Sequence, residues 1–499
     1  MGCGIFGVKN FNNQTVFPYI YWGLRAQNHR GQQSHGFLTF SQGQFFSYKN
    51  LDIVPKIKTT ANDEWIERLP GSVGMGNVRY TTSGKCDNST IIQGTQPVIG
   101  NIDSIEMAIS FNGSIINEQE LKDKLCSKLD NFVHNCDADI ICYELLLGFK
   151  QGKDLLGAVR GVMESVDGAF SVIGILRDGT IFAFKDPYGI KPLCVGYSSD
   201  RQTLVFSSET VGLDMNSFER AFELNPGELV IATKEGFIRH QLIEGSRHAF
   251  CAFEYAYFAR PDSQFDGKYV YEVREAFGRN IVYENPDVIK EGDIIISVPE
   301  TGDDPAMGVH EASGLRWERA SRRHRYITER AFISLDNERF STIDKKINIL
   351  GSKVAGKNVI ICEDSIVRGD TTKVIIDKLR KSGAKKIFVF ATYPRVIGPC
   401  FYGVDMSTYE QLVGAKNSPE EIAKIIGADG VCYLSLEKVV ESIGKSCDQL
   451  CLACANGKYP TPLAQKLADT MKKEFFEKPK ETKYDCKTEE NICKYKKTE

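Results

Sequence analysis

The feature that most constrains the fold is an apolar strand that runs into a polar loop and then a helix. Residues 358–362 have the apolar pattern of a strand, and the sequence EDSIVRGDTT follows at 363–372. A helix is predicted over 371–381, ending at Ser382–Gly383, and a second strand over 386–392. Strand, loop, helix and strand in this order predict a parallel α/β sheet.

The first half of the chain has a different pattern of predicted elements, in which short strands alternate with turns. Helical apolar spacing occurs at 19–26 and 137–148, so layers of sheet and helix are expected there. The alternation of strand, loop and helix begins near residue 285, with a strand over 293–298 and a helix near 305–313. A chain of 499 residues exceeds the ~250–300 of one ordinary core, so two domains are predicted. The strands expected in the first half are 4–8, 72–78, 107–110, 169–175, 181–185 and 204–207.

Charge and hydropathy exclude several classes of protein. The net charge is −3, which gives no strong attraction to nucleic acid, and we expect none as a partner. No apolar run approaches the ~18 residues that span a bilayer, and no signal peptide is recognisable. We therefore expect no membrane partner and a cytoplasmic location. The segment 466–499, rich in Lys and Glu beyond about residue 472, is expected to be a mobile C-terminal tail.

The chain has fifteen cysteines, an odd number that fits poorly with a secreted disulfide framework. Several lie in apolar stretches, where cysteine acts as a small hydrophobe. We expect these to be core residues: Cys142, Cys194, Cys362 and Cys432. The candidates for chemistry are Cys3 at the N-terminus and a late group of Cys447, Cys451 and Cys454.

Cys3 heads a short predicted strand, CGIFGV. A cysteine that becomes residue one can use its own α-amino group as general base, because that amine has a pKa of about 7.7–8.0. The alternative is an inert thiol at an untidy N-terminus. The motif alone does not decide between these interpretations.

Other segments could bind an amino-acid amide beside such a nucleophile. Arg79 could hold an α-carboxylate bidentately, and Asp137 could face an α-ammonium. Asn112–Gly113 offers a side-chain amide and a backbone N–H to a tetrahedral oxyanion. Each also has an ordinary interpretation: a surface ion pair for Arg79, a helix cap for Asp137 and a hairpin turn for Asn112–Gly113.

In order along the chain, these segments resemble the glutaminase domain of the N-terminal-nucleophile (Ntn) hydrolases, the class II glutamine amidotransferases. The motifs HRGQ at 29–32 and DPYGIKPL at 186–193 belong to the same resemblance, which covers residues 3–240. It implies an N-terminal αββα Ntn-hydrolase sandwich with Cys3, Asn112 and Gly113 as catalytic residues. Met1 and Gly2 would have to be removed; N-myristoylation of Gly2 is a competing idea, although Phe6 stands where Ser or Thr is preferred. The implied glutamine contacts are Arg30, Arg79, Thr82 and Asp137.

The loop at 363–372 suits a sugar phosphate. Backbone N–H groups and threonine hydroxyls at a helix N-terminus can cradle a phosphate, while paired carboxylates at the strand end face ribose hydroxyls and a divalent metal. The alternative is an ordinary capped strand-to-helix turn of an α/β fold.

This loop resembles the diphosphate-ribose motif of the type I phosphoribosyltransferases, and specifically of the glutamine phosphoribosylpyrophosphate amidotransferases. Segments 251–263, 398–403 and 451–460 match that family, so the resemblance spans about residues 3–465. It implies an α/β and α+β protein, with a type I phosphoribosyltransferase parallel-sheet domain at 260–465. Mg²⁺ ligands would be Thr301, Glu363 and Asp364, and a loop between 325 and 357 would close on substrate. The implied phosphoribosyl diphosphate contacts are Asp364, Ser365, Arg368, Gly369, Asp370, Thr371 and Thr372.

The chain departs from the family at three places in this half. Glu363–Asp364 replaces paired aspartates, VPET at 298–301 replaces the common Pro-Asp-Ser, and the closing loop at 326–333 is altered. Asp370 adds a carboxylate to the phosphate loop, where like charges ~4 Å apart repel by about 4 kcal/mol at an effective dielectric of 20. We expect its side chain to point to solvent.

Family members that carry a [4Fe–4S] cluster hold it with four cysteines, and the matching positions here are Cys251, Cys400, Cys451 and Cys454. Thiolates suit iron–sulfur chemistry, so we expect a structural cluster. Zinc is the alternative, and Cys447 is an alternative ligand.

The resemblance implies an enzyme of the first step of purine synthesis. It would form 5-phosphoribosylamine from glutamine and phosphoribosyl diphosphate, with ammonia passing internally between two sites. The partners implied are a homo-oligomer (dimer or tetramer) and purine nucleotides as feedback inhibitors. The alternatives are a paralogue whose second half only binds nucleotide or regulates, and a glutaminase that feeds another acceptor.

Overall fold

The structure is a computed structural model that describes residues 3–57, 63–80, 87–130, 132–233, 236–245, 247–324 and 344–477. Its first half contains a seven-stranded antiparallel sheet in which β1 (Gly4–Asn10) pairs with β4 on one side and β10 on the other. The strand that follows Cys3 is therefore central and buried. The order is β11 (Glu219–Glu223), β9 (Cys194–Tyr197), β10 (Thr203–Ser207), β1, β4 (Val73–Arg79), β2 (Ser34–Ser41) and β3 (Gln44–Leu51).

A six-stranded antiparallel sheet packs face to face against the first. Its order is β13 (Gly236–Gln241), β12 (Glu228–Thr233), β8 (Ile181–Lys185), β7 (Gly168–Leu176), β6 (Ile105–Ile115) and β5 (Val98–Ile102). Residues such as Ile5 and Ile173 fill the layer between the two sheets.

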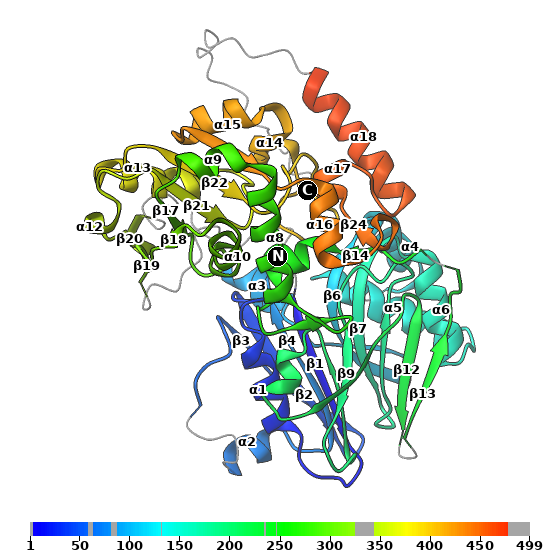
Figure 1. Ribbon diagram of the computed structural model, residues 1–499. Helices are drawn as coiled ribbons and strands as arrows, with labels where there is room; N and C mark the ends of the chain where they lie inside the picture. The colour runs from blue at the N-terminus through cyan, green and yellow to red at the C-terminus, as the bar shows by residue number, and fades with distance from the viewer. Residues whose placement is uncertain are drawn as a thin grey trace, which may run out of the picture.

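Helices cover the outer faces of both sheets. On the first sheet lie α1 (Phe17–Ala26) and α7 (Val211–Asp214), and on the second α4 (Glu118–Lys128), α5 (Asp137–Lys150) and α6 (Leu155–Ser165). The four layers confirm the predicted αββα sandwich, which forms the lower part of Figure 1. Two short helices, α2 (Asp63–Arg68) and α3 (Asn88–Gln93), lie in the connections.

The second half contains a five-stranded parallel sheet, as predicted (Figure 1, upper part). Its strands are almost wholly apolar because helices cover both faces. One face packs against α13 (Asp370–Lys381) and α15 (Pro419–Ile426), the other against α8 (Val270–Glu284), α10 (Asp303–Ser313) and α16 (Leu436–Ile443). The strand order is β18 (Arg316–Trp317), β17 (Ile294–Ser297), β21 (Val359–Glu363), β22 (Ile387–Ala391) and β23 (Gly430–Tyr433).

Smaller elements complete this half and connect it to the sandwich. A π-helical turn, η1 (Glu254–Phe258), stands at the junction. The others are β15 (Gln264–Phe265), β16 (Lys268–Tyr269), α9 (Pro286–Glu291), β19 (Ser321–Arg323), β20 (Ile347–Ile349), α12 (Gly351–Val354), η2 (Tyr409–Gln411), α14 (Val413–Lys416) and η3 (Cys447–Gln449).

The C-terminal segment returns to the junction between the two halves. β14 (Phe250–Cys251) pairs in parallel with β24 (Leu450–Cys451), and α17 (Ala453–Asn456) and α18 (Pro462–Glu477) follow. The prediction of a mobile tail from residue 466 is therefore corrected: the segment to 477 is helical, because Ala464, Ala468 and Phe475 form a buried stripe. Residues 478–499 lie outside the described part of the chain.

The predicted elements agree with the structure. Each strand and helix expected from the sequence overlaps an observed element of the same type, and α13 ends at Ser382–Gly383, where Gly383 has φ +86°. None of the described helices is both long and apolar enough to cross a membrane.

Candidate active site

The polypeptide backbone at Cys3 is held on both sides. Its nitrogen donates to Oδ1 of Asn112 at 3.1 Å, and its carbonyl oxygen accepts from Nε of Arg30 at 3.0 Å. The residue is 8% exposed and leads into the central strand β1. The Cys3 thiol is thus attached to a backbone that hydrogen bonds hold on both sides.

Asn112 and Gly113 lie side by side on β6, next to Cys3. Asn112 is fully buried, and its Nδ2 donor makes no hydrogen bond within the described residues. A Cβ at Gly113 would lie 1.9 Å from the carbonyl oxygen of Ala169, so only glycine fits this position. An unpartnered buried donor is costly unless a ligand satisfies it, so Nδ2 is available to an oxyanion formed at Cys3.

Arg79 and Asp137 flank the same site. Arg79, the last residue of β4, is 8% exposed and donates from Nη1 to the carbonyl of Ile91 at 3.3 Å. Asp137 begins α5 and accepts from the N–H of Ile115 at 3.0 Å. Burial and the charge of Glu118 raise the pKa of Asp137 to about 7, against the opposing effect of Arg79. Thr82, the fourth predicted glutamine contact, lies outside the described residues.

Two further groups at Asp137 were not found from the sequence. Ligand atoms of Glu118, His134 and Asp137 lie within 4.8 Å of one another, and His134 Nε2 is 3.3 Å from Glu118 Oε1. This concentration of carboxylates suits a cation such as an ammonium group. No motif marks Glu118 or His134: Glu118 begins α4, His134 lies in the segment that leads into α5, and folding brings both to Asp137.

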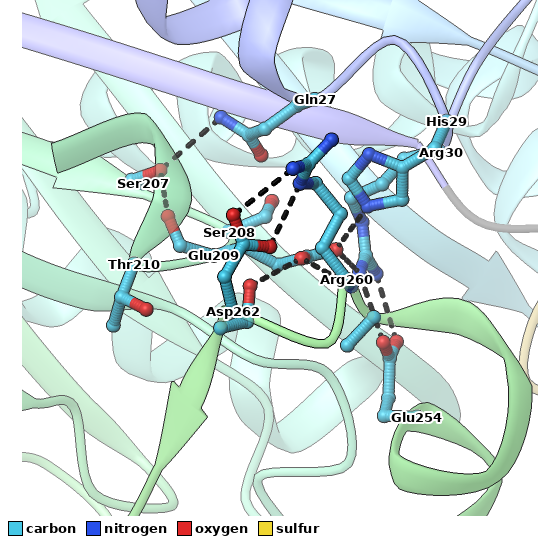
Figure 2. Close-up of polar contacts among 12 residues, drawn as sticks. Gln27, His29, Arg30, Ser207, Ser208, Glu209, Thr210, Glu254, Arg260 and Asp262 are labelled. Carbon is cyan, nitrogen blue, oxygen red and sulfur yellow. Dashed lines mark hydrogen bonds and ion pairs between the residues drawn. The ribbon is translucent and has the colours of Figure 1, made fainter. Parts of the chain in front are cut away.

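The guanidinium of Arg30 is enclosed by other protein groups. It is fully buried and donates to two carboxylates, to Glu209 Oε1 at 2.5 Å and to Glu254 at 2.8 and 2.9 Å (Figure 2). Burial would lower its pKa, but the charges of Glu254 and Glu209 more than offset this and raise it. The predicted role as a glutamine contact is therefore revised: Arg30 supports the Cys3 backbone, and its guanidinium is occupied by protein groups.

The second predicted site lies at the carboxyl ends of the parallel strands. Glu363 ends β21, and its Oε2 accepts from the hydroxyl of Thr372 at 2.6 Å. Asp364 accepts from Ser365 Oγ at 2.6 Å and from the hydroxyl of Thr301. The predicted metal and ribose ligands are thus brought together. Burial raises the pKa of Glu363 to about 8, with a further contribution from Asp364 that the Thr372 hydrogen bond opposes.

The loop between β21 and α13 has the form expected of a phosphate cradle. Gly369 caps α13 with φ +85°, a left-handed conformation that glycine adopts without strain. Thr371 and Thr372 stand in the first turn, where backbone N–H groups lack helical partners.

Asp370 is half-buried rather than pointing simply to solvent. Together with Arg368 it lines a cavity of about 630 Å³ that Tyr409, Lys416 and Phe475 also border. Of the predicted closing loop, residues 325–343 lie outside the described part of the chain.

The four predicted cluster cysteines converge at the junction. Cys251 and Cys451 are paired on β14 and β24, Cys454 lies in α17, and Cys400 is near enough for its charge to act on the other three. Cys447, the alternative ligand, is exposed. The predicted core cysteines 142, 194 and 362 are buried, and Cys432 is partly buried.

A buried lysine lies close enough to Cys251 for its charge to act on that thiol. Lys191 is fully buried, and its Nζ makes no hydrogen bond among the described residues. Burial raises the pKa of Cys251 to about 12, and the charge of Lys191 is the first effect that opposes it. Lys191 stands in the 186–193 motif, which does not mark it as a neighbour of the cysteines.

Comparisons with known proteins identify the family of this chain. A glutamine amidotransferase domain model matches residues 86–215. The amidophosphoribosyltransferase of Methanothermobacter thermautotrophicus is 34% identical over 94% of this chain and 96% of its own length, and that of Synechococcus elongatus is 32% identical over 93% and 92%. The structure of B. subtilis glutamine phosphoribosylpyrophosphate amidotransferase, complexed with ADP and GMP, matches with a TM-score of 0.82 and 29% identity over 92% of this chain and 98% of that one. The chain therefore belongs to the amidophosphoribosyltransferase family, whose members carry out the glutamine-dependent first step of purine synthesis.

Proposed function

We propose that Cys3 releases ammonia from glutamine and that a phosphoribosyl diphosphate bound at Asp364 accepts it. The observation that carries this proposal is the state of Asn112, whose Oδ1 orients the Cys3 nitrogen while its buried Nδ2 makes no hydrogen bond within the described residues. One side chain would thus hold the base and stabilise the oxyanion that forms beside it.

The glutamine-cleaving steps follow from these groups. After removal of Met1 and Gly2, the α-amino group of Cys3 takes the thiol proton while sulfur attacks the amide carbon. Asn112 Nδ2 and the Gly113 N–H stabilise the resulting oxyanion. The amine returns the proton to the leaving nitrogen, which departs as ammonia, and water then hydrolyses the thioester to glutamate.

Glutamine would be held by charge at its two ends. Arg79 and Thr82 bind its α-carboxylate, and Asp137 binds its α-ammonium. Glu118 adds negative charge beside Asp137, which supports a cationic ligand there. In this proposal Arg30 positions Cys3 and does not contact glutamine.

Phosphoribosyl diphosphate would occupy the loop after β21. Its 5′-phosphate is cradled by Ser365, Arg368 and residues 369–372, and its ribose hydroxyls face Glu363 and Asp364. Ammonia attacks the anomeric carbon, and diphosphate leaves with the bonding electrons, giving 5-phosphoribosylamine.

The donor set at this site fits Mg²⁺, which prefers oxygen ligands. The groups that would hold it are the two carboxylates and Thr301, whose hydroxyl already contacts Asp364. When bound, the ion would neutralise charge on the departing diphosphate.

The cysteines would hold a structural [4Fe–4S] cluster. Cys251, Cys400, Cys451 and Cys454 lie close enough for their charges to act on one another, which supports a shared ligand site, and thiolates suit iron–sulfur chemistry. The buried ammonium of Lys191 would offset the negative charge of thiolates. The proposed ligands are Cys251, Cys400, Cys451 and Cys454.

We retain the proposed domains of 3–240 and 260–465, and extend the second to Glu477 because α18 packs on it. We also propose a homo-oligomer in the cytoplasm. Feedback by purine nucleotides is supported by the B. subtilis relative, whose structure is described as a complex with ADP and GMP.

The test is formation of 5-phosphoribosylamine by the purified protein, with glutamine or with ammonium as nitrogen donor. Cys3→Ala should abolish the glutamine-dependent reaction and leave the ammonia-dependent one intact. A wild-type protein that forms no product from either donor would favour the regulatory paralogue.

A further inference from the structure

Polar contacts, linked by the backbone of turn η1 and by the start of α10, join the Cys3 backbone to the proposed phosphoribosyl site. They begin at Arg30, which donates 3.0 Å to the Cys3 carbonyl and is then held bidentately by Glu254. Bidentate arginine–carboxylate pairs fix orientation as well as distance. The position of Glu254 therefore determines where the carbonyl of the nucleophile residue is held.

Glu209 ties the same network to the segment that follows Glu254. One of its oxygens accepts from Arg30 and His29, and the other accepts from the N–H of Arg260 at 3.0 Å and the hydroxyl of Ser263 at 2.6 Å (Figure 2). Glu209 and Glu254 are fully buried, so their charges depend on Arg30 for compensation. Both ends of segment 254–263 are thereby anchored to the sandwich.

Glu254 is the first residue of the π-helical turn η1, and a second arginine clamps this turn from the other side. Arg274, on α8, is 1% exposed and donates to the carbonyls of Tyr255 and Ala259, each at 2.8 Å. Turns of this type are rare and often found at functional sites. The turn is thus fixed between one arginine of each half.

Arg274 also reaches the phosphoribosyl half. Its Nη1 lies 3.4 Å from Oδ2 of Asp304, in the first turn of α10. Thr301, three residues earlier, contacts Asp364. Helices α8 and α10 touch through their backbones, since a Cβ at Gly278 would lie 2.0 Å from the Pro305 carbonyl oxygen. Because the two helices are in direct contact, a movement at the start of α10 moves Arg274 as well, with no intervening side chains to take it up.

We propose that the Arg30–Glu254–Arg274–Asp304 contacts form a positioning relay, through which a ligand at the Thr301–Asp364 site sets the placement of Cys3. The Asp304–Arg274 contact is the longest of the arginine contacts, and the Asp304 side chain is 21% exposed, so a bound ligand acts on the relay there. Arg274, Glu254 and Asp304 are positioning residues that touch neither substrate. The proposal rests on the proposed function and adds a route between its two sites.

The test uses Asp304→Asn in the full-length protein, which keeps the shape of the side chain and removes its charge. Its matched control is Asp303→Asn, since Asp303 is a neighbouring acid that accepts a hydrogen bond from Ser297, whereas Arg274 pairs with Asp304. Glutaminase rates are measured with and without phosphoribosyl diphosphate and Mg²⁺, beside ammonia-dependent synthesis and the thermal midpoint. Asp304→Glu tests rescue by restored charge.

We expect Asp304→Asn to reduce the stimulation ratio of the glutaminase about five-fold, within the range for one contact in a coupling network. Basal glutaminase, ammonia-dependent synthesis and thermal midpoint should match those of Asp303→Asn, and Asp304→Glu should regain part of the ratio. An unchanged ratio in Asp304→Asn, or an equal loss in Asp303→Asn, overturns the relay. A wild-type protein that makes product but is not stimulated also overturns it, whereas failure to make product overturns the proposed function itself.

Discussion

Glutamine binding should weaken as the pH falls through 7, because Asp137 must be ionised to hold the substrate ammonium. Burial and Glu118 raise the pKa of this carboxyl to about 7. It is then about ten times less ionised at pH 6 than at pH 8, and the dissociation constant of glutamine should rise about ten-fold over that interval. The affinity is thus present above the pKa and lost below it.

The assay is calorimetric titration of glutamine into the Cys3→Ala protein, which binds without turnover. Glu118→Gln is the informative variant, since removing the neighbouring charge should move the midpoint to lower pH and strengthen binding at pH 6. Asp137→Asn should bind weakly at every pH. An affinity that stays constant between pH 6 and pH 8, or a midpoint that Glu118→Gln leaves in place, would refute this role of Asp137.

Four further outcomes are expected. Intact mass should show Cys3 as the first residue of active protein; full activity with Gly2 retained would contradict the proposed base. Asn112→Ala should lower the glutaminase kcat by about 10²–10³-fold, as for loss of one oxyanion donor, with little change in the ammonia-dependent rate. Asp364→Asn should remove stimulation by phosphoribosyl diphosphate and Mg²⁺ while basal glutaminase persists. Anaerobic protein should be brown and contain roughly four irons per chain, whereas one zinc and no iron would exclude the cluster; its proposed ligands are Cys251, Cys400, Cys451 and Cys454.

The candidate site residues that the sequence predicts are those that stand in short motifs. Cys3, Asn112 and Asp364 each stand in a local pattern that predicts a nucleophile, an oxyanion donor or a ribose ligand, and the structure brings each to a site. Strands β1 and β21 can also be predicted from the sequence. The apolar residues of β1 are bounded by turns, and β21 precedes a capped helix.

What the sequence did not predict depends on contacts between distant segments. Arg30 was assigned to glutamine because its partners Glu209 and Glu254 lie 179 and 224 residues away. His134 has no motif at all. The composition of α18 is typical of a mobile tail, because its many charged residues outnumber a stripe of only three buried ones.

The parallel pairing of Phe250–Cys251 with Leu450–Cys451 also restricts how the two halves can move. The phosphoribosyl half follows β14, and β24, near its C-terminal end, returns to pair beside β14, so the start and the end of this half are held at one place. A body attached by one linker can swing freely, whereas one attached by two adjacent strands can only twist or rock about them. Disrupting either strand should therefore allow the two halves to move independently. A circular permutant whose chain is opened elsewhere should keep their relative placement.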